Sequence, residues 1–200
     1  MSDEPDGARV GDRVLVTKGP RPRHEGPGRR GDGAAGLPVR GPLRAEADDD
    51  LADDATDRFY DMSPVRDALV ASAAGPVTAM HDATECGVCG GLFEMARAAG
   101  VQVAIEHDRV PVLPGIVEAC DSFGIDPWAS ISEGTLLLTV DPSGADDVLA
   151  ALDEEGIPAA DVGEVREGSG LEVDGEAVDH PGVDPFRGAM EECAAKLAEE

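Results

Sequence analysis

The stretch VTAMHDATECGVCGGLFEMARAAGVQVAI, residues 77–105, predicts a strand, a polar loop, a helix and a second strand. Residues 77–80 form the short first strand, and the polar loop follows it. Apolar side chains recur on one face of residues 87–99, and Gly100 follows as a helix stop. Residues 101–105 alternate in the manner of a half-buried strand. This order of elements predicts helices layered against a sheet.

The alternation of strands and helices continues beyond this stretch. A continuous apolar run at residues 135–140 predicts a central strand that is buried on both faces. The pair Asp174-Gly175, between two short apolar segments, is typical of a hairpin turn. Caps, stops and apolar periodicity predict helices at residues 63–74, 116–123, 143–155 and 184–197, and a further strand at residues 162–165. The sequence therefore predicts an α+β fold, with helices packed against a mixed sheet.

Residues 20–45 differ in composition from the rest of the chain. The segment from Gly19 to Arg44 holds six arginines and two acidic residues, and glycine and proline fill 12 of its 26 positions. The segment contains few apolar residues, and burying them cannot offset the entropy that the chain would lose on ordering. We therefore predict that the segment is disordered. Three interpretations stay open: a basic nucleic-acid arm, a flexible linker, and the product of a compensated frameshift in GC-rich DNA.

The chain carries 42 acidic and 16 basic residues, which gives a formal net charge of -26. This charge excludes simple electrostatic binding of nucleic acid, which needs clustered lysines and arginines. An acidic surface with Lys18 and Lys196 as its lysines is typical of a protein kept in solution at high salt. The alternative is an acidic protein that binds a basic partner. Because acidic residues are spread over the whole region after Glu46, we favour a salt-loving source.

The sequence also predicts a cytoplasmic protein without a membrane partner. Its apolar runs are all shorter than a membrane span. The negative charge argues against docking on an anionic membrane surface. The acidic start MSDEPD is followed by no apolar stretch, unlike a secretory signal.

The loop MHDATECGVCGG, residues 80–91, is the first candidate for chemistry. A polar loop that enters a helix N-terminus presents backbone N–H groups to an anion, helped by the helix dipole. Gly87, Gly90 and Gly91 would let the backbone approach a ligand closely. In the alternative interpretation, Thr84 caps the helix and the glycines serve packing. Spacing alone does not decide between the two.

Cys86 and Cys89 form a Cys-x-x-Cys pair, and Cys120 and Cys193 are the other cysteines. Four thiolates can hold zinc, but a zinc site usually shows a second closely spaced pair, which this sequence lacks. A redox pair is the other possibility, because a helix N-terminus lowers a thiol pKa. We therefore expect no metal, and we regard Cys86 and Cys89 as a weak candidate site.

Three segments, in order along the chain, resemble PurM-like, AIR synthase-related proteins. They are GDRVLVTKG at residues 11–19, MHDATECGVCGGLFEMARAAGV at residues 80–101 and VPVLPGIVEACDSFGIDPWASISEGTLLLTV at residues 110–140. The likeness points to the C-terminal domain of HypE-like members, and the acidic composition to a haloarchaeal source. Cys86 replaces a usual glycine of the family motif.

The resemblance implies a domain organisation and a cofactor. In this family an N-terminal domain holds the metal-binding aspartates and much of the nucleotide site. Residues 1–19 would then be the remnant of such a domain, residues 20–45 the arginine-, proline- and glycine-rich segment, and residues 46–200 the AIR synthase-related C-terminal domain. Family enzymes use ATP and Mg²⁺, which we do not expect this chain alone to bind tightly.

The resemblance also implies two loops that face the cleft between the domains. The first is a ligand- or phosphate-facing loop, and the second precedes the buried strand. Their residues are His81, Asp82, Thr84, Gly87 and Gly90 in the first loop, and Ser132, Glu133 and Gly134 in the second.

The function implied by the resemblance is that of an ATP-dependent protein that phosphorylates an oxygen or otherwise activates a C–O group. Because the N-terminal domain is missing from this sequence, we expect a truncated chain that is catalytically incomplete by itself. Two alternatives stay open. One is a stand-alone binding or assembly domain that pairs with a separately encoded ATP-binding half or forms a homodimer. The other is an inactive gene fragment.

Overall fold

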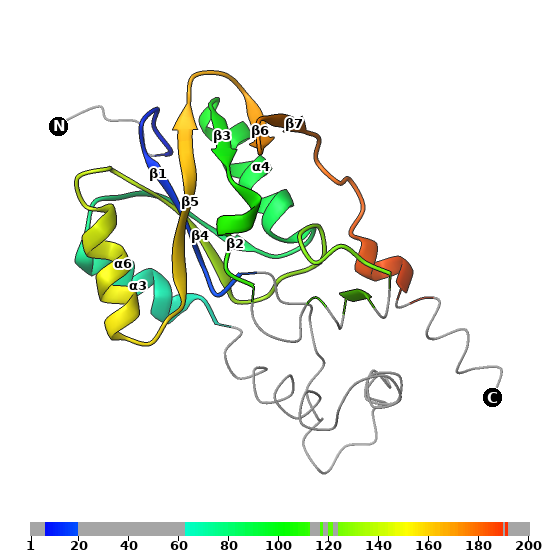
Figure 1. Ribbon diagram of the computed structural model, residues 1–200, viewed down its shortest axis with the longest axis horizontal. Helices are drawn as coiled ribbons and strands as arrows, with labels where there is room; N and C mark the ends of the chain where they lie inside the picture. The colour runs from blue at the N-terminus through cyan, green and yellow to red at the C-terminus, as the bar shows by residue number, and fades with distance from the viewer. Residues whose placement is uncertain are drawn as a thin grey trace, which may run out of the picture.

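The computed structural model describes residues 7–19, 63–112, 117, 120–121, 124–189 and 191. Within them, seven strands form one mixed sheet in the order β2-β4-β1-β5-β3-β6-β7 (Figure 1). Neighbouring strands are antiparallel, except that β3 and β6 are parallel. The strands are β1 (Arg13–Thr17), β2 (Val77–Ala83), β3 (Gln102–Ile105), β4 (Thr135–Val140), β5 (Ala159–Arg166), β6 (Gly170–Val173) and β7 (Glu176–Val178). The helices are α3 (Val65–Ala74), α4 (Gly87–Ala99) and α6 (Ala145–Glu154), with a 3-10 turn η2 (His107–Arg109).

Helices cover both faces of this sheet. On one face, Leu92 of α4 shares a buried cluster with Val14 and Val16 of β1. On the other face, α3 and α6 lie side by side and enclose Leu15 of β1 together with Val148 (Figure 1). Because side chains alternate across a strand, β1 contributes to both cores. The apolar clusters on the two faces hold the layers together.

The α+β fold predicted from the sequence is confirmed. Helix α4 and strand β4 have the predicted bounds, residues 87–99 and 135–140, and every residue of β4 is buried. The predicted turn Asp174-Gly175 joins β6 to β7. Residues 185–189 are helical, in agreement with the predicted start of the last helix.

Strand β2 is longer than predicted. It continues beyond Met80 to Ala83, and His81 and Asp82 pair with Leu137 and Leu136 of β4. His81 and Asp82 therefore lie in a strand and not, as predicted from the sequence, in a loop. Pairing with the buried strand β4 outweighs the low strand propensity of aspartate, which a local pattern cannot anticipate.

Strand β1 lies in the middle of the sheet, between β4 and β5. The family resemblance implies that residues 1–19 are the end of a preceding domain. In the structure Val14, Leu15 and Val16 are fully buried in the two cores of this same sheet. The segment 13–17 is thus integral to the domain that contains β2 to β7.

Some predictions fall outside the described residues. These are the disorder of residues 20–45, the domain boundary at residue 45 and most of the helix predicted at 116–123. None of the helices in the described part of the chain combines the length and apolar character that crossing a bilayer requires. The cytoplasmic location and the salt-loving source stay predictions.

Candidate functional site

The two segments that the sequence singled out meet at one end of the sheet. The last residue of β2, Ala83, pairs with Thr135, the first residue of β4. Just beyond this pair, the N–H of Ser132 donates a hydrogen bond of 3.1 Å to the carbonyl of Thr84. The structure therefore places the end of β2 beside the loop at residues 132–134.

Asp82 has unused hydrogen-bonding capacity at this meeting point. Its Oδ1 atom is buried and has no hydrogen-bond partner among the described residues. Burial raises the pKa of Asp82, the negative charge of Glu133 raises it further, and His81 and Lys18 oppose the rise. A carboxyl group in this state can accept a proton or a hydrogen bond from a ligand.

His81 lies on the opposite side of β2 from Asp82, because side chains alternate along a strand. Its Nε2 atom is 3.0 Å from Oε2 of Glu94 on α4. Its Nδ1 atom is 2.7 Å from the backbone carbonyl oxygen of Asp82. Both ring nitrogens therefore have protein partners, and the ring joins β2 to α4.

A network of buried polar groups lies at the same end of the sheet. Lys18 Nζ is 3.0 Å from Asp67 Oδ1, and their side chains are 9% and 1% exposed. The other carboxylate oxygen of Asp67 accepts a 2.7 Å hydrogen bond from Thr17 Oγ1. Thr135 Oγ1 donates to the carbonyl of Gly19 and lies 3.1 Å from Ser132 Oγ.

This network connects helix α3, through Asp67, to the loop that carries Ser132. Thr17 Oγ1 also accepts a hydrogen bond of 3.1 Å from the N–H of Leu136 in β4. Since buried polar groups need partners, each link fixes the position of the next. The network therefore sets the geometry of the end of β2, which carries Asp82, and of the loop that carries Glu133.

The predicted loop residues Gly87 and Gly90 lie against protein atoms. A Cβ on Gly87 would be 2.3 Å from the carbonyl oxygen of Ser130, and Gly87 has φ +58°. A Cβ on Gly90 would be 2.6 Å from the Cβ of Cys86. Both glycines are buried, and close packing accounts for them.

The N-terminus of α4 is occupied by acceptors from the protein itself. The N–H of Cys86 donates to Asp184 Oδ2 at 2.7 Å, and the N–H of Cys89 donates to the carbonyl of Trp128 at 3.1 Å. Thr84 is exposed, and the residue in the N-cap position is Cys86, in the left-handed region at φ 59°. Thr84 therefore does not cap α4. The carboxylate of Asp184 lies at the N-terminus of this helix, where the sequence predicts that an anionic ligand could bind.

The second loop contributes two buried residues and one half-buried carboxylate. Ser132 and Gly134 are buried, whereas Glu133 is half-buried. Gly134 has φ 86°, a conformation that favours glycine. Glu133 is thus the residue of this loop whose charge acts on Asp82.

The cysteine pair lies at the start of α4, where Cys86 is buried and Cys89 is half-buried. Cys86 is buried, and burial raises its pKa, as do the charges of Asp184 and Glu85. Burial, together with the charge of Asp126, raises the pKa of Cys89 to about 11. A reactive redox thiol needs the opposite shift, so the raised pKa values do not favour a redox role for this pair. In the described part of the chain, no three His, Cys, Asp or Glu residues are grouped so as to hold a metal ion.

Alkylation of Cys89 is expected to be slow near neutral pH and to accelerate as the pH rises. With a pKa of about 11, roughly one thiol in a thousand is ionised at pH 8. The rate should therefore rise about tenfold for each pH unit up to the pKa. Mass spectrometry after iodoacetamide treatment measures this rate against a cysteine in an unstructured peptide. Equal rates at pH 8 would show that the Cys89 thiol is not shielded from solvent as the structure places it.

Sequence reasoning missed the buried partners of this site. Lys18 and Asp67 are 49 positions apart, and no motif connects them. The available signal was weak: Lys18 is one of two lysines in the chain, and Asp67 lies in a predicted helix. Asp184 was expected at the start of the last helix, but its contact with α4 has no local signature.

The chain matches a known protein family over a range that includes the three segments quoted from its sequence. The family model "AIR synthase related protein, C-terminal domain" matches residues 9–176. A carbamoyl dehydratase HypE from Rhizobium leguminosarum bv. viciae is 33% identical over 163 residues, which cover 80% of this chain and 42% of that protein. The chain thus spans less than half the length of this curated relative.

Two solved structures show the same fold. The crystal structure of HypE from Escherichia coli, a hydrogenase maturation protein, aligns with a TM-score of 0.63 at 23% identity, over 92% of this chain and 54% of that one. A crystal structure of the hydrogenase maturation protein HypE in complex with ATP aligns with a TM-score of 0.56 at 21% identity, over 88% of this chain and 53% of that one. At these identities the likeness establishes a common fold.

Proposed function

Because the chain belongs to the family of AIR synthase related proteins, whose C-terminal domain its residues 9–176 match, we propose that it forms one wall of an ATP-dependent active site. The observation that carries the proposal is the buried Oδ1 atom of Asp82, which has no partner among the described residues. A buried acceptor without a partner costs free energy, and such atoms are expected where a ligand completes a site.

In this proposal Asp82 binds the substrate group that becomes activated. Burial and the charge of Glu133 raise its pKa, and a carboxylate with a raised pKa is a stronger base. Asp82 accepts the proton of a substrate O–H or N–H group at Oδ1 and thereby orients the oxygen or nitrogen for attack. Bound ATP with Mg²⁺ would supply the phosphoryl group.

We assign the groups that hold ATP and Mg²⁺ mainly to a second domain, which pairs with this chain as a separate polypeptide. Two findings support this. The chain covers 42% of the length of its HypE relative, and a HypE of the same fold has been crystallised with ATP. The chain alone is then expected to bind Mg-ATP weakly.

Reconstitution tests the proposal. The full chain is titrated with Mg-ATP by calorimetry, alone and after addition of the N-terminal domain of the Rhizobium relative, and ADP release is measured with a panel of hydroxyl and amide acceptors. We expect ADP release in the mixture, and a loss of roughly 100-fold in Asp82→Asn. The matched control is Asp108→Asn, whose carboxylate is fully exposed in η2.

Two results would contradict the proposal. Micromolar binding of Mg-ATP by the chain alone would place the nucleotide site within it. Undiminished ADP release in Asp82→Asn would remove Asp82 from the reaction. Stable association of the two domains without any ADP release would favour the alternative of a binding or assembly domain.

A further inference from the structure

Among the described residues, no helix packs over one half of the sheet on the face that carries α3 and α6. These helices pack over the side of β1 and β4 that carries Leu15 and Leu138. Further along the same face, an open pocket of about 530 Å³ lies over β5, β3 and β6. Ala104 and Gly163 contribute small side chains or none, so the sheet backbone lies close to the space. A volume of this order suits a small molecule.

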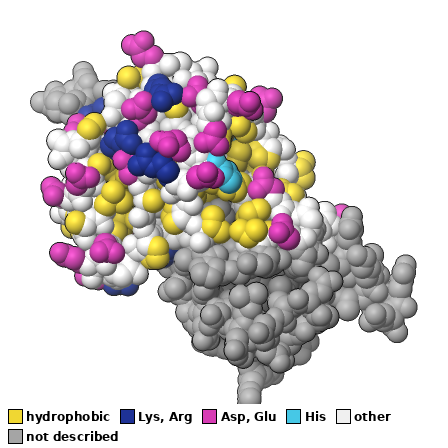
Figure 2. Space-filling view, in the orientation of Figure 1, with side chains coloured by type: hydrophobic (Ala, Val, Ile, Leu, Met, Phe, Trp, Pro, Cys, Tyr) yellow, Lys and Arg dark blue, Asp and Glu magenta, His cyan; other side chains and the backbone are white. Residues whose placement is uncertain are grey.

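Both signs of charge line this pocket. The lining includes three arginines and four carboxylates, which gives a local charge of -1 in a chain of net charge -26. Figure 2 shows dark blue basic side chains gathered on this face with magenta acidic side chains among them. Such a balance disfavours a polyphosphate, and it favours a ligand that is itself neutral but carries both charges. The charged residues are Arg13, Glu106, Arg109, Glu164, Arg166, Glu172 and Asp174.

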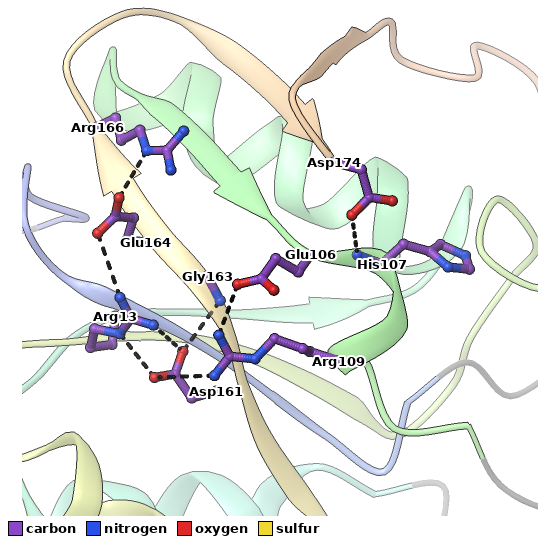
Figure 3. A network of polar contacts seen from close by, with 9 residues as sticks. All are labelled: Arg13, Glu106, His107, Arg109, Asp161, Gly163, Glu164, Arg166 and Asp174. Atoms are coloured by element: carbon purple, nitrogen blue, oxygen red, sulfur yellow. Dashed lines mark hydrogen bonds and ion pairs between the residues drawn. The ribbon is translucent and has the colours of Figure 1, made fainter.

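One arginine of the pocket is held rigidly by a carboxylate (Figure 3). Arg13 donates from Nε and Nη2 to the two oxygens of Asp161, at 2.9 and 2.8 Å. The N–H of Gly163 donates to the same carboxylate at 3.2 Å. Bidentate pairs of this kind fix both partners, so one wall of the pocket is preorganised.

Other groups keep bonding capacity that faces the same space. Arg109 donates one hydrogen bond within the described part of the chain, from Nη1 to Glu106 at 2.9 Å, and its side chain is 42% exposed. Its Nη2 is 4.0 Å from Asp161, beyond hydrogen-bond range. Asp174 accepts the N–H of His107 at Oδ1, 3.0 Å away, which leaves Oδ2 for another donor (Figure 3).

From this arrangement we infer that the pocket binds a small zwitterion of the amino-acid type. The carboxylate of the ligand accepts hydrogen bonds from Arg109, and its ammonium group donates to Oδ2 of Asp174, while Glu172 stays paired with Arg166. The remaining arginines stay paired with their carboxylates, so binding requires no buried charge to lose its partner. The site is separate from Asp82 and depends on neither ATP nor a second domain.

Amide chemical shifts of the full chain test the inference, with L-serine as the probe. Serine is expected to shift the amide signals of Ala104, Gly163 and Gly175, which line the pocket. Two analogues each lack one charge: 3-hydroxypropanoate has no ammonium group, and ethanolamine has no carboxylate. Each should bind at least about tenfold more weakly than serine.

Two variants separate the contacts. Arg109→Gln removes the donor for the carboxylate, and Asp174→Asn removes the charge for the ammonium group while asparagine still suits the turn. Each should weaken serine binding by about tenfold. The control is Arg187→Gln, another surface arginine, which pairs with Glu85 at 2.8 Å away from the pocket and should bind serine normally.

Three outcomes would overturn the inference. They are the absence of shifts with serine, equal binding of serine and both analogues, and normal serine binding in both pocket variants. Any of these outcomes would mean that the ion pairs only stabilise this face of the sheet and do not bind a ligand. None would bear on Asp82, so this failure is distinguishable from a failure of the proposed function.

Discussion

Replacing Asp67 with asparagine is expected to lower the free energy of unfolding by about 3 kcal/mol. The Asp67 side chain is 1% exposed, and its carboxylate lies 3.0 Å from Lys18 Nζ and accepts a hydrogen bond from Thr17. The substitution keeps the shape of the side chain but removes the negative charge beside a buried ammonium group. A charge that loses its buried counter-charge is far more costly than a broken surface pair.

Urea unfolding measures this loss, and Asp179→Asn provides the matched control. Asp179 is an exposed loop residue, so removal of its charge should change stability by less than about 0.5 kcal/mol. The double variant Asp67→Asn/Lys18→Met removes both charges, and its loss should be clearly smaller than the sum of the two single losses. Additive losses would show that the two side chains do not form an ion pair in solution.

The ion pair also shows why the site was only partly predictable. Helix α4 and strand β4 could be delimited from the sequence because their apolar periods are local and their ends carry stop or turn residues. Lys18 and Asp67, by contrast, meet only because β1 enters the sheet beside β4 and α3 packs across it. That arrangement is set by pairing between distant segments, for which one sequence contains no local signal.

Asp82 is an intermediate case. The family motif identified the residue as a ligand-facing candidate, but it placed the residue in a loop. The structure places it in β2, paired with Leu136, so that its orientation is fixed by the alternation of the strand. A carboxylate on a paired strand is positioned more rigidly than one on a loop, which suits the substrate-orienting role that we propose for Asp82.

Packing explains the glycines of the motif, whereas it does not explain Asp82. Close contacts with the protein account for Gly87 and Gly90, and the N–H of Cys86 is bound by Asp184. The motif therefore contains residues with two different roles, which a sequence pattern alone cannot tell apart. One part presents a carboxylate, and the other lets α4 approach the segment at residues 128–130.

Gly87→Ala tests the second role and is expected to cost about 3 kcal/mol of stability. About 1 kcal/mol of this comes from φ +58°, which disfavours any Cβ. The rest comes from the new Cβ, which would lie 2.3 Å from the carbonyl oxygen of Ser130 and 2.7 Å from that of Trp128. Since both contacts are with backbone, α4 has to move away from this segment.

Gly100→Ala separates the two costs. Gly100 ends α4 at φ +68°, but a Cβ there would meet nothing within 4 Å. The free energy of unfolding of this control should therefore fall by only about 1 kcal/mol, because only the backbone conformation is unfavourable for alanine. The single tryptophan of the chain, Trp128, should change its fluorescence in folded Gly87→Ala but not in folded Gly100→Ala. Equal losses and unchanged fluorescence would mean that α4 does not lie against residues 128–130, and the packing role of the motif glycines would then be wrong.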